Sequence, residues 1–351
     1  MIEIALATDA HYLCGLLVTA VSLALHASPD ADLRFNVLDG GISDNAWADF
    51  EAKVRAAHPR SFFRRLSVDD TRFAAYPEWN GRSRLTYARL LLPTLMPDTD
   101  WVIYCDVDFL WCADVAELWA LRDSRATLLS TPDGAETCTR EAAWFAARGL
   151  TCNSNTYFCA GLSFFNLALW RHFGLAEKVL TFLDEHTDVL IVDQSAMNAI
   201  LGGEALAPDV LNVKMLPGKW QKMSRFVTAE DIRGGCVIHY AGDTPWRQAC
   251  RTQPLTDLHL LWHMVYGELQ AESASASLAR FFPSKVVRLR RFLFYLIATP
   301  VLREFVSLVY RLTGRSGYVA WMKGCCRRFP VDEMLIRFLR RTSTSAGDMN
   351  Q

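Results

Sequence analysis

The 351-residue chain lacks several features that would assign it to a class at once. Its ten cysteines form no C-x-x-C pair and have no regular spacing, and several lie in apolar, strand-like runs where cysteine behaves as a small hydrophobe. We therefore expect reduced cysteines and a cytosolic protein. The amino terminus has no basic n-region, so we expect no signal peptide. The longest late apolar run, at 292–302, contains Pro300 and is too short to span a bilayer.

The formal charge of the chain is nearly balanced, at −1, but it is unevenly distributed. Residues 280–341 carry 14 Lys and Arg against 3 Asp and Glu, so the rest of the chain is acidic. A basic segment on an acidic body suggests an anionic partner for that segment. With 51% hydrophobic and 12% aromatic residues, the composition is typical of a globular protein rather than a disordered one.

The first part of the chain alternates the patterns of strands and helices. Strands are predicted at 2–8, 34–38, 62–68 and 101–105. Helices are predicted at 13–26, 43–57 and 83–95. This alternation predicts an α/β fold with a mostly parallel sheet and helices on both faces. A small, polar stretch at 269–282 suggests a linker between a body at 1–268 and a basic region at 283–341, with a loose tail at 342–351.

Two carboxylates follow the strand predicted at 101–105. Asp106 and Asp108 are two residues apart, so both side chains fall on the same side of an extended chain. Burying two like charges together is costly unless a cation or a proton lies between them. A hard divalent cation, Mn²⁺ or Mg²⁺, satisfies both carboxylates and also binds phosphate oxygens. Ligands of open α/β sheets bind beyond the carboxyl ends of the strands, where this pair is expected to lie.

The end of the first strand carries no G-x-G-x-x-G motif. Ala7 and Thr8 lead instead to Asp9 and Tyr12, and a carboxylate there accepts hydrogen bonds from a base or ribose while a tyrosine stacks on a base. The alternative is that Asp9 only caps the following helix. In the third predicted helix, Arg89 has the guanidinium fork that suits phosphate, with an ordinary surface arginine as the alternative.

Three later motifs have both a chemical and a purely structural interpretation. The Ala160-Gly161 pair lets a ligand approach the backbone closely, or it marks a bulge in a strand. Asp193 and Gln194 open a helix, where the dipole favours a carboxylate whether or not it is catalytic. His239 ends an apolar strand, and it either joins the two carboxylates around Mn²⁺ or is a hydrogen-bonded interior residue.

Taken in order, these motifs resemble those of the family 8 glycosyltransferases, especially the bacterial lipopolysaccharide galactosyl- and glucosyltransferases. The resemblance spans roughly residues 2–264. The segments that carry it are Asp9 with Tyr12, residues 37–43, Thr86-Tyr87-Ala88-Arg89-Leu90, Asp106-Val107-Asp108, Tyr157-Phe158-Cys159-Ala160-Gly161, Asp193-Gln194, Leu216-Pro217-Gly218-Lys219-Trp220 and His239-Tyr240-Ala241-Gly242. The shared order of the motifs is far more specific than any one of them.

The resemblance implies a Rossmann-like GT-A fold and transfer of galactose or glucose from UDP-galactose or UDP-glucose, with retention of the anomeric configuration. Asp106, Asp108 and His239 match the ligands of Mn²⁺ (or Mg²⁺), and Asp193 and Gln194 match catalytic groups at the donor sugar. The other residues implied in binding the donor are Ala7, Thr8, Asp9, Tyr12, Arg89, Val107, Asp133, Cys159, Ala160, Gly161 and Gly242.

The chain departs from the family pattern at several positions. Cys159 and His11 stand where relatives carry Asn, and Ser195 stands where they carry a carboxylate. The motif that begins at His239 is one residue shorter than the family's and lacks its Lys, so another cation must face the departing diphosphate. The candidates for that cation are Lys219 and Arg247.

The resemblance also implies a nucleotide-sugar donor and a lipid-linked oligosaccharide acceptor. The basic segment indicates an anionic membrane surface as a further partner, and the acidity of the body argues against nucleic acid. Basic helices with aromatic and aliphatic faces lie at anionic membrane surfaces. We therefore expect the region at 283–341 to be helical and to hold the catalytic domain, 1–268, at the inner face of the cytoplasmic membrane. The alternative is a helical cap packed on that domain.

The sequence therefore predicts a transferase that builds lipopolysaccharide core or lipooligosaccharide. Two other interpretations stay open: a family 8 transferase for a capsular or protein-linked glycan, and a catalytically weakened sugar-binding scaffold. The scaffold is suggested by Cys159, Ser195 and the missing Lys.

Overall fold

The computed structural model describes residues 1–78, 83–133, 135–201, 213–224, 227–242, 244–246, 257–272 and 274–281. The chain forms two units. The first comprises Met1–Leu16, Ala27–Val107 and Asp114–Gln221, and the second comprises Leu17–His26, Asp108–Ala113 and Lys222–Gln351. Helix α1 (Leu13–His26) contributes to both units, and the acidic motif at 106–108 lies at one of the points where the chain passes between them.

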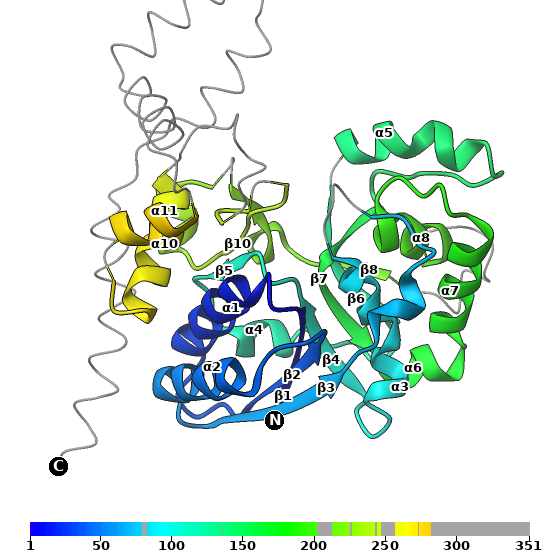
Figure 1. Cartoon of the computed structure of the whole chain (residues 1–351). Coiled ribbons are helices and arrows are strands. Elements are labelled where there is room, and N and C mark those ends of the chain that lie inside the picture. Colours follow the sequence, from blue (N-terminus) through cyan, green and yellow to red (C-terminus); the bar gives the residue numbers. More distant parts are fainter. Residues whose placement is uncertain are drawn as a thin grey trace, which may run out of the picture. The chain divides into compact units, whose positions relative to one another are not determined.

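The first unit is built on a seven-stranded sheet with the strand order β3-β2-β1-β4-β7-β6-β8 (Figure 1). Its first four strands in the chain are β1 (Ile2–Thr8), β2 (Leu33–Asp39), β3 (Ser61–Ser67) and β4 (Trp101–Cys105). All four run parallel, because helical crossovers connect them as the alternating pattern predicts. The order changes direction between β1 and β4, and ligands of such sheets bind beyond the carboxyl ends of the strands at that point.

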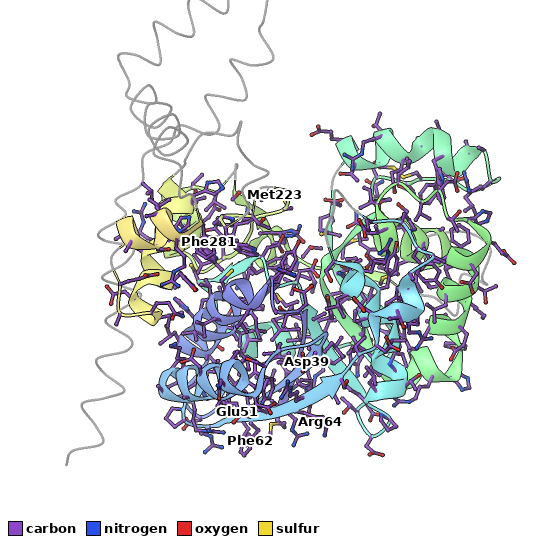
Figure 2. The ribbon with its side chains drawn as sticks, viewed as in Figure 1. Asp39, Glu51, Phe62, Arg64, Met223 and Phe281 are labelled. Carbon is purple, nitrogen blue, oxygen red and sulfur yellow. A yellow bond between two sulfur atoms is a disulfide. The ribbon has the colours of Figure 1, made fainter. Side chains whose placement is uncertain are left out.

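The remaining strands of this sheet are β7 (Phe158–Asn166), β6 (Leu128–Pro132) and β8 (Val213–Met215). Strand β7 is antiparallel to β4 and β6, and β8 is parallel to β6. Consequently the first residues of β7 lie at the same sheet edge as the last residues of β1, β4 and β6. At the far side of the sheet β3 is an edge strand, and its Phe62 is 48% exposed (Figure 2).

Helices flank this sheet. The longer ones in the first unit are α2 (Asp44–Ala57), α5 (Ala135–Ala146), α7 (Leu175–Glu185) and α8 (Val192–Leu201). The short ones are η1 (Asp70–Phe73), η2 (Arg84–Leu91), α3 (Leu92–Leu95), α4 (Val115–Trp119), α6 (Leu167–His172) and η3 (Gly218–Trp220). Helix α2 begins as the sequence predicts, because the Ser43 hydroxyl accepts a hydrogen bond from Ala46 N at 3.4 Å.

One large apolar cluster supports the sheet edge at which β1, β4 and β6 end and β7 begins. It joins β4 and β7 to η2, α6, α7 and α8 through fully buried side chains such as Tyr87, Phe165, Trp170, Leu183 and Met197. Close packing of this kind fixes side-chain rotamers, so polar groups carried by the same elements are held with little freedom.

The second unit contains a three-stranded sheet with the order β5-β10-β9. Its elements are β5 (Phe109–Trp111), β9 (Lys222–Met223), α9 (Ala229–Arg233), β10 (Val237–His239), α10 (Asp257–Leu269) and α11 (Ala274–Phe281). Helix α1 anchors β5, since the Thr19 hydroxyl donates to Phe109 O at 2.7 Å and the Ser22 hydroxyl accepts from Trp111 N at 3.0 Å. None of the helices in the described part of the chain is long and apolar enough to cross a bilayer.

The structure differs from three local expectations. The helix expected at 83–95 is a 3-10 helix followed by the single turn of α3, where Pro93 provides no amide hydrogen for a continuous α-helix. Helix α11 lies inside the linker expected at 269–282, and its Ser277 contacts the His263 ring at 2.9 Å. The domain bounds otherwise stay a prediction, and residues 283–351 lie outside the described residues.

The third difference concerns the cysteines. We expect reduced thiols from the sequence, but the structure contains a disulfide between Cys138 and Cys152, with Cα atoms 5.8 Å apart. The two are 14 residues apart in the chain, and the turn after α5 brings them together. Sequence spacing does not reveal such a pair, because it depends on the path of the loop.

Candidate functional site

The acidic motif follows a strand that is buried along nearly its whole length. Only Trp101 in β4 is partly exposed, and Asp106 comes directly after its last residue. The Asp106 amide donates to Gly161 O at 2.8 Å, which holds the end of β4 against the start of β7. The carboxylate of Asp106 is thus delivered to the carboxyl edge of the sheet, as predicted.

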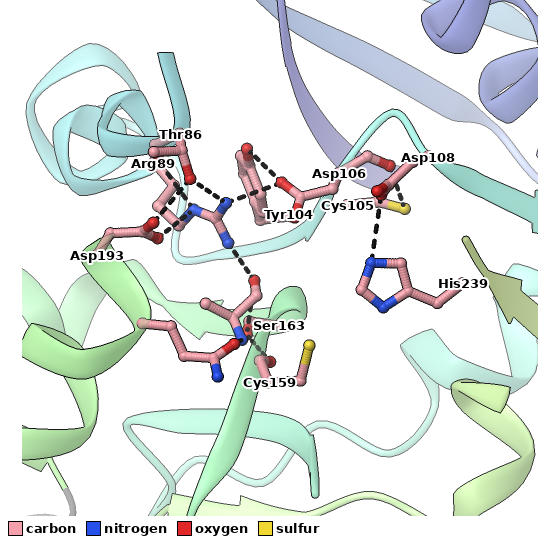
Figure 3. Close-up of polar contacts among 12 residues, drawn as sticks. Thr86, Arg89, Tyr104, Cys105, Asp106, Asp108, Cys159, Ser163, Asp193 and His239 are labelled. Atoms are coloured by element: carbon pink, nitrogen blue, oxygen red, sulfur yellow. Dashed lines mark hydrogen bonds and ion pairs between the residues drawn. The ribbon is translucent and has the colours of Figure 1, made fainter. Parts of the chain in front are cut away.

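His239 reaches the motif through strand pairing. Strands β10 and β5 are antiparallel, with His239 opposite Phe109, and Tyr240 N donates to Asp108 O at 2.9 Å. This register places His239 Nε2 3.3 Å from Asp108 Oδ1 (Figure 3). The imidazole also stacks on the Phe109 ring, with centroids 4.1 Å apart, so its orientation is fixed.

Asp106, Asp108 and His239 together form a group that could hold a metal ion. Each offers one ligand atom, and these atoms all lie within 4.8 Å of one another. Two carboxylates and one imidazole suit Mn²⁺, and the carboxylates alone suit Mg²⁺. The donor chemistry therefore fits the metal that the sequence predicts, and the group is the one of its kind in the described residues.

Arg89 is the centre of a second polar cluster. It is 1% exposed, although the sequence left open an ordinary surface arginine, and that alternative is wrong. Its guanidinium lies 2.8 Å from Asp106 Oδ1 and 2.9 Å from Asp193 Oδ2, and it also donates to Ala160 O (Figure 3). One buried cation thus joins the acidic motif to the start of helix α8.

The aromatic and hydroxyl neighbours of Arg89 complete this cluster. The guanidinium stacks over the Tyr104 ring at 4.2 Å, and the Tyr104 hydroxyl donates to Asp106 at 3.1 Å. Thr86 bridges the ion pair of Arg89 and Asp193, since its hydroxyl donates to Asp193 at 2.7 Å and accepts from Arg89 at 3.0 Å. These contacts give Arg89 one orientation.

The charges of the cluster support one another. Burial alone lowers the pKa of Arg89, but Asp106 and Asp193 raise it above its ordinary value, so the guanidinium stays charged. Burial raises the pKa of Asp193, while Arg89 and Thr86 act in the opposite direction. Burial also raises the pKa of Tyr104, which therefore acts as a neutral hydrogen-bond donor.

Gln194 is held by three polar contacts at the start of α8. Its side-chain nitrogen donates to Asp133 at 2.7 Å and to the Tyr157 hydroxyl at 3.3 Å, and its side-chain oxygen accepts from Ala160 N at 3.0 Å. Asp133 follows β6 directly, so the contacts of Gln194 with Asp133 and Ala160 bring together the end of β6 and the beginnings of β7 and α8. The predicted residues Asp133, Ala160 and Gln194 are therefore neighbours.

The residues predicted at the end of β1 form a tight turn. The Asp9 carboxylate accepts from His11 N at 2.8 Å and from Tyr12 N at 3.2 Å, so the capping interpretation describes its contacts. Ala7 and Thr8 end the strand, and Thr8 O accepts from Gly40 N at 2.9 Å. A role for Asp9 and Tyr12 toward uridine stays a prediction.

The other predicted residues lie in different settings. Cys159 and Val107 are 5% and 7% exposed, and Gly242 has a φ of +79°, which glycine adopts without strain. The Lys219 ammonium is paired with Glu117 on α4, so it is already engaged by a carboxylate. Arg247 lies outside the described residues.

Two buried residues of the site could not be assigned a role from the sequence. Tyr157 belongs to the motif at 157–161 without an evident role of its own, and Glu141 belongs to no motif. Glu141 lies on the buried stripe of α5 that also contains Cys138, Trp144 and Phe145. A charged residue at helical spacing within an apolar stripe was the available signal.

Comparison with known proteins agrees with this geometry. The model of the family described as glycosyl transferase family 8 matches residues 3–250. General stress protein A of Bacillus subtilis is 29% identical over 187 residues, which cover 52% of this chain and 62% of that relative. Lipopolysaccharide 1,2-glucosyltransferase of Escherichia coli K12 is 24% identical over 257 residues, covering 70% of this chain and 73% of that enzyme.

A solved structure is similar over most of its length. The crystal structure of the galactosyltransferase LgtC, in complex with donor and acceptor sugar analogues, matches with a TM-score of 0.61 and 25% identity. The match covers 76% of this chain and 96% of that one, so the mostly parallel sheet with its helices is a GT-A-like α/β fold. Because the family model matches residues 3–250, which are most of this chain, the chain belongs to glycosyl transferase family 8.

Proposed function

We propose that the protein transfers galactose or glucose from UDP-galactose or UDP-glucose to a lipid-linked oligosaccharide, of the lipopolysaccharide core or lipooligosaccharide type, with Mn²⁺ or Mg²⁺. The observation that carries this proposal is the group of Asp106, Asp108 and His239 in a family 8 chain. The similarity to a lipopolysaccharide glucosyltransferase supports the acceptor class, and the similarity to the galactosyltransferase LgtC leaves both hexoses as donors.

The residues of the site divide between the nucleotide and the sugar. Asp9 and Tyr12 would contact uridine, and Asp106, Asp108 and His239 would hold the metal beside the diphosphate. A bound divalent cation neutralises the charge that develops on the departing UDP. Arg89 keeps the Asp106 and Asp193 carboxylates in place, and Asp193 would hold hydroxyls of the donor sugar.

The mechanism that we propose retains the anomeric configuration without a covalent intermediate at residue 195. Ser195 offers no carboxylate there, and its hydroxyl donates to Glu141 at 2.6 Å. In a front-face reaction the bond from the anomeric carbon to the phosphate oxygen breaks, and the bond to the acceptor oxygen forms on the same face. The leaving phosphate accepts the acceptor's proton, and Gln194 lies on the opposite face.

The first test is a donor and acceptor screen. With Mn²⁺, we expect hexose transfer from UDP-galactose or UDP-glucose to one member of a panel of truncated lipopolysaccharides, and loss of transfer in EDTA. NMR of the initial product should show the donor's anomeric configuration. An inverted product would contradict the mechanism, whereas UDP-sugar binding without hydrolysis or transfer would favour a sugar-binding scaffold. Transfer only to capsular or protein-linked glycans would replace the proposed acceptor.

We also propose that the basic region at 283–341 holds the protein peripherally at the inner face of the cytoplasmic membrane. The support is the excess of Lys and Arg between residues 280 and 341. Deletion of 283–351 should move the protein from anionic vesicles to the supernatant, and high salt should do so in part. Deletion of 342–351 alone is the matched control and should change nothing. An unchanged distribution in the longer deletion would favour a packing role for the region.

A further inference from the structure

Helix α5 buries a carboxylate that the proposed reaction does not use. Glu141 is 0% exposed and lies on the apolar stripe of the helix. Burial raises the pKa of its carboxyl group, while hydrogen bonds from Ser195 and Tyr157 lower it. A buried carboxylate without hydrogen-bond donors is strongly unfavourable, so the two hydroxyl groups are the partners that allow Glu141 to be buried.

Both partners of Glu141 direct their protons toward it. The Ser195 hydroxyl accepts from Ile191 N at 2.8 Å and donates to Glu141 Oε1 at 2.6 Å. The Tyr157 hydroxyl accepts from the Gln194 side-chain nitrogen at 3.3 Å and donates to Glu141 Oε2. The donors and acceptors thus form one directed path from Gln194 through Tyr157 to Glu141.

Asp133 and Ala160 set which way the Gln194 amide faces, and the path from Glu141 through Tyr157 holds the amide nitrogen in that position. Its nitrogen lies between Tyr157 and Asp133, which is 2.7 Å away, while its oxygen receives Ala160 N at 3.0 Å. The reversed amide would direct its oxygen at the Asp133 carboxylate and its nitrogen at the Ala160 amide. Both contacts would be repulsive, so the network admits one orientation.

We propose that Glu141 is a positioning residue that fixes the Gln194 amide through the Tyr157 hydroxyl. Without the carboxylate, the Tyr157 proton has no acceptor on the buried side, and the phenol is free to turn its donor toward Gln194. That rotation removes an acceptor from the Gln194 nitrogen and loosens the amide oxygen. The inference rests on the proposed function, in which Gln194 lies beside the donor sugar.

The test compares variants along the path. Glu141→Gln has one acceptor oxygen for two hydroxyl donors, so we expect kcat for transfer to fall about tenfold or more while the KM for the donor stays within about twofold. Tyr157→Phe should lower kcat similarly, and the double variant should fall no further, because both changes break one path. Gln194→Ala gives the floor. Glu136→Gln makes the same change at an exposed position on the same helix, and it should stay within about twofold of the unaltered protein.

Stability separates positioning from a general structural role. Glu141→Gln removes a buried charge, which favours folding, but it leaves one buried hydroxyl without an acceptor, which opposes folding, so we expect its unfolding temperature to change little while kcat falls. A purely structural residue would lower both together. If Glu141→Gln keeps near-normal kcat, or loses activity only in proportion to unfolded protein, the proposal is overturned. Should that variant fail to fold, Tyr157→Phe decides alone by the same criteria.

A second measurement does not depend on turnover. The full-length chain contains six glutamines, and ¹⁵N labelling of them identifies the Gln194 side-chain amide as the signal lost in Gln194→Ala. That signal should shift in Glu141→Gln and in Tyr157→Phe but not in Glu136→Gln. An unmoved signal would overturn the positioning role. If the unaltered protein transfers no hexose, the proposed function fails separately, and the NMR result still decides the contact between these residues.

Discussion

Asp108→Asn should lower Mn²⁺-dependent transfer about 100-fold or more, and it should leave the protein folded. The variant keeps the shape of the side chain but removes the charge that faces His239 and Asp106 in the candidate metal group. Binding of Mn²⁺ in the presence of UDP, measured by titration calorimetry, should weaken in parallel. The calorimetric measurement is independent of the acceptor and therefore of the proposed linkage.

Asp49→Asn provides a matched control for this variant. Asp49 lies on α2, where it pairs with Lys53 at 2.6 Å, and its side chain is 53% exposed. We expect transfer and metal binding within about twofold of the unaltered protein, because exposed pairs contribute little. Full activity of Asp108→Asn, or full activity in EDTA, would remove the metal group from the mechanism.

The second large effect is on stability. Arg89→Met should destabilise the protein by about 3–5 kcal/mol, because it leaves two carboxylates in a buried cluster without their shared cation. The loss of the cation should affect Asp193 more than Asp106. Only 2% of the Asp193 side chain reaches solvent, against 32% for Asp106, so water cannot replace the guanidinium there. Unfolding in urea, followed by circular dichroism, measures the effect. Adding Asp193→Asn to Arg89→Met should recover part of the loss.

Arg84→Met is the matched control on the same 3-10 helix. Arg84 pairs with Glu78 at 2.8 Å, and its side chain is 32% exposed, so its replacement should cost less than about 1 kcal/mol. If Arg89→Met unfolds within about 1 kcal/mol of the unaltered protein, the guanidinium does not stabilise the two carboxylates as the geometry indicates.

The strands and the acidic motif could be predicted because their signals are local. The structure confirms the strand bounds 2–8 and 101–105 and the helix bounds 13–26, each carried by a run of apolar residues ended by polar ones. The break in the helix at 83–95 has a local cause as well, since Pro93 lies within it. The bounds 83–95 hold, because helical turns cover 84–95, and only the continuous α-helix that the apolar pattern predicts is absent.

The contacts among distant residues could not be predicted in the same way. Arg89 resembles any helical arginine in the sequence, and only the fold shows that it lies between Asp106 and Asp193. Glu141 and Ser195 are 54 residues apart, and no local pattern indicates that they share a hydrogen bond. Partners of buried charges are determined by tertiary packing, which local propensity does not encode.

The reversed direction of β7 determines how the site tolerates change. Its first residues reach the functional edge through the backbone, since Ala160 O accepts from Arg89 and Gly161 O accepts from Asp106 N. Main-chain contacts are indifferent to the side chain, so the chemistry of residue 159 is free to differ among relatives without altering them. Length is not free: a one-residue insertion within 162–166, where β7 pairs residue by residue with β4, would exchange the faces of the strand, whereas loop 147–156 would absorb the same insertion before the strand begins.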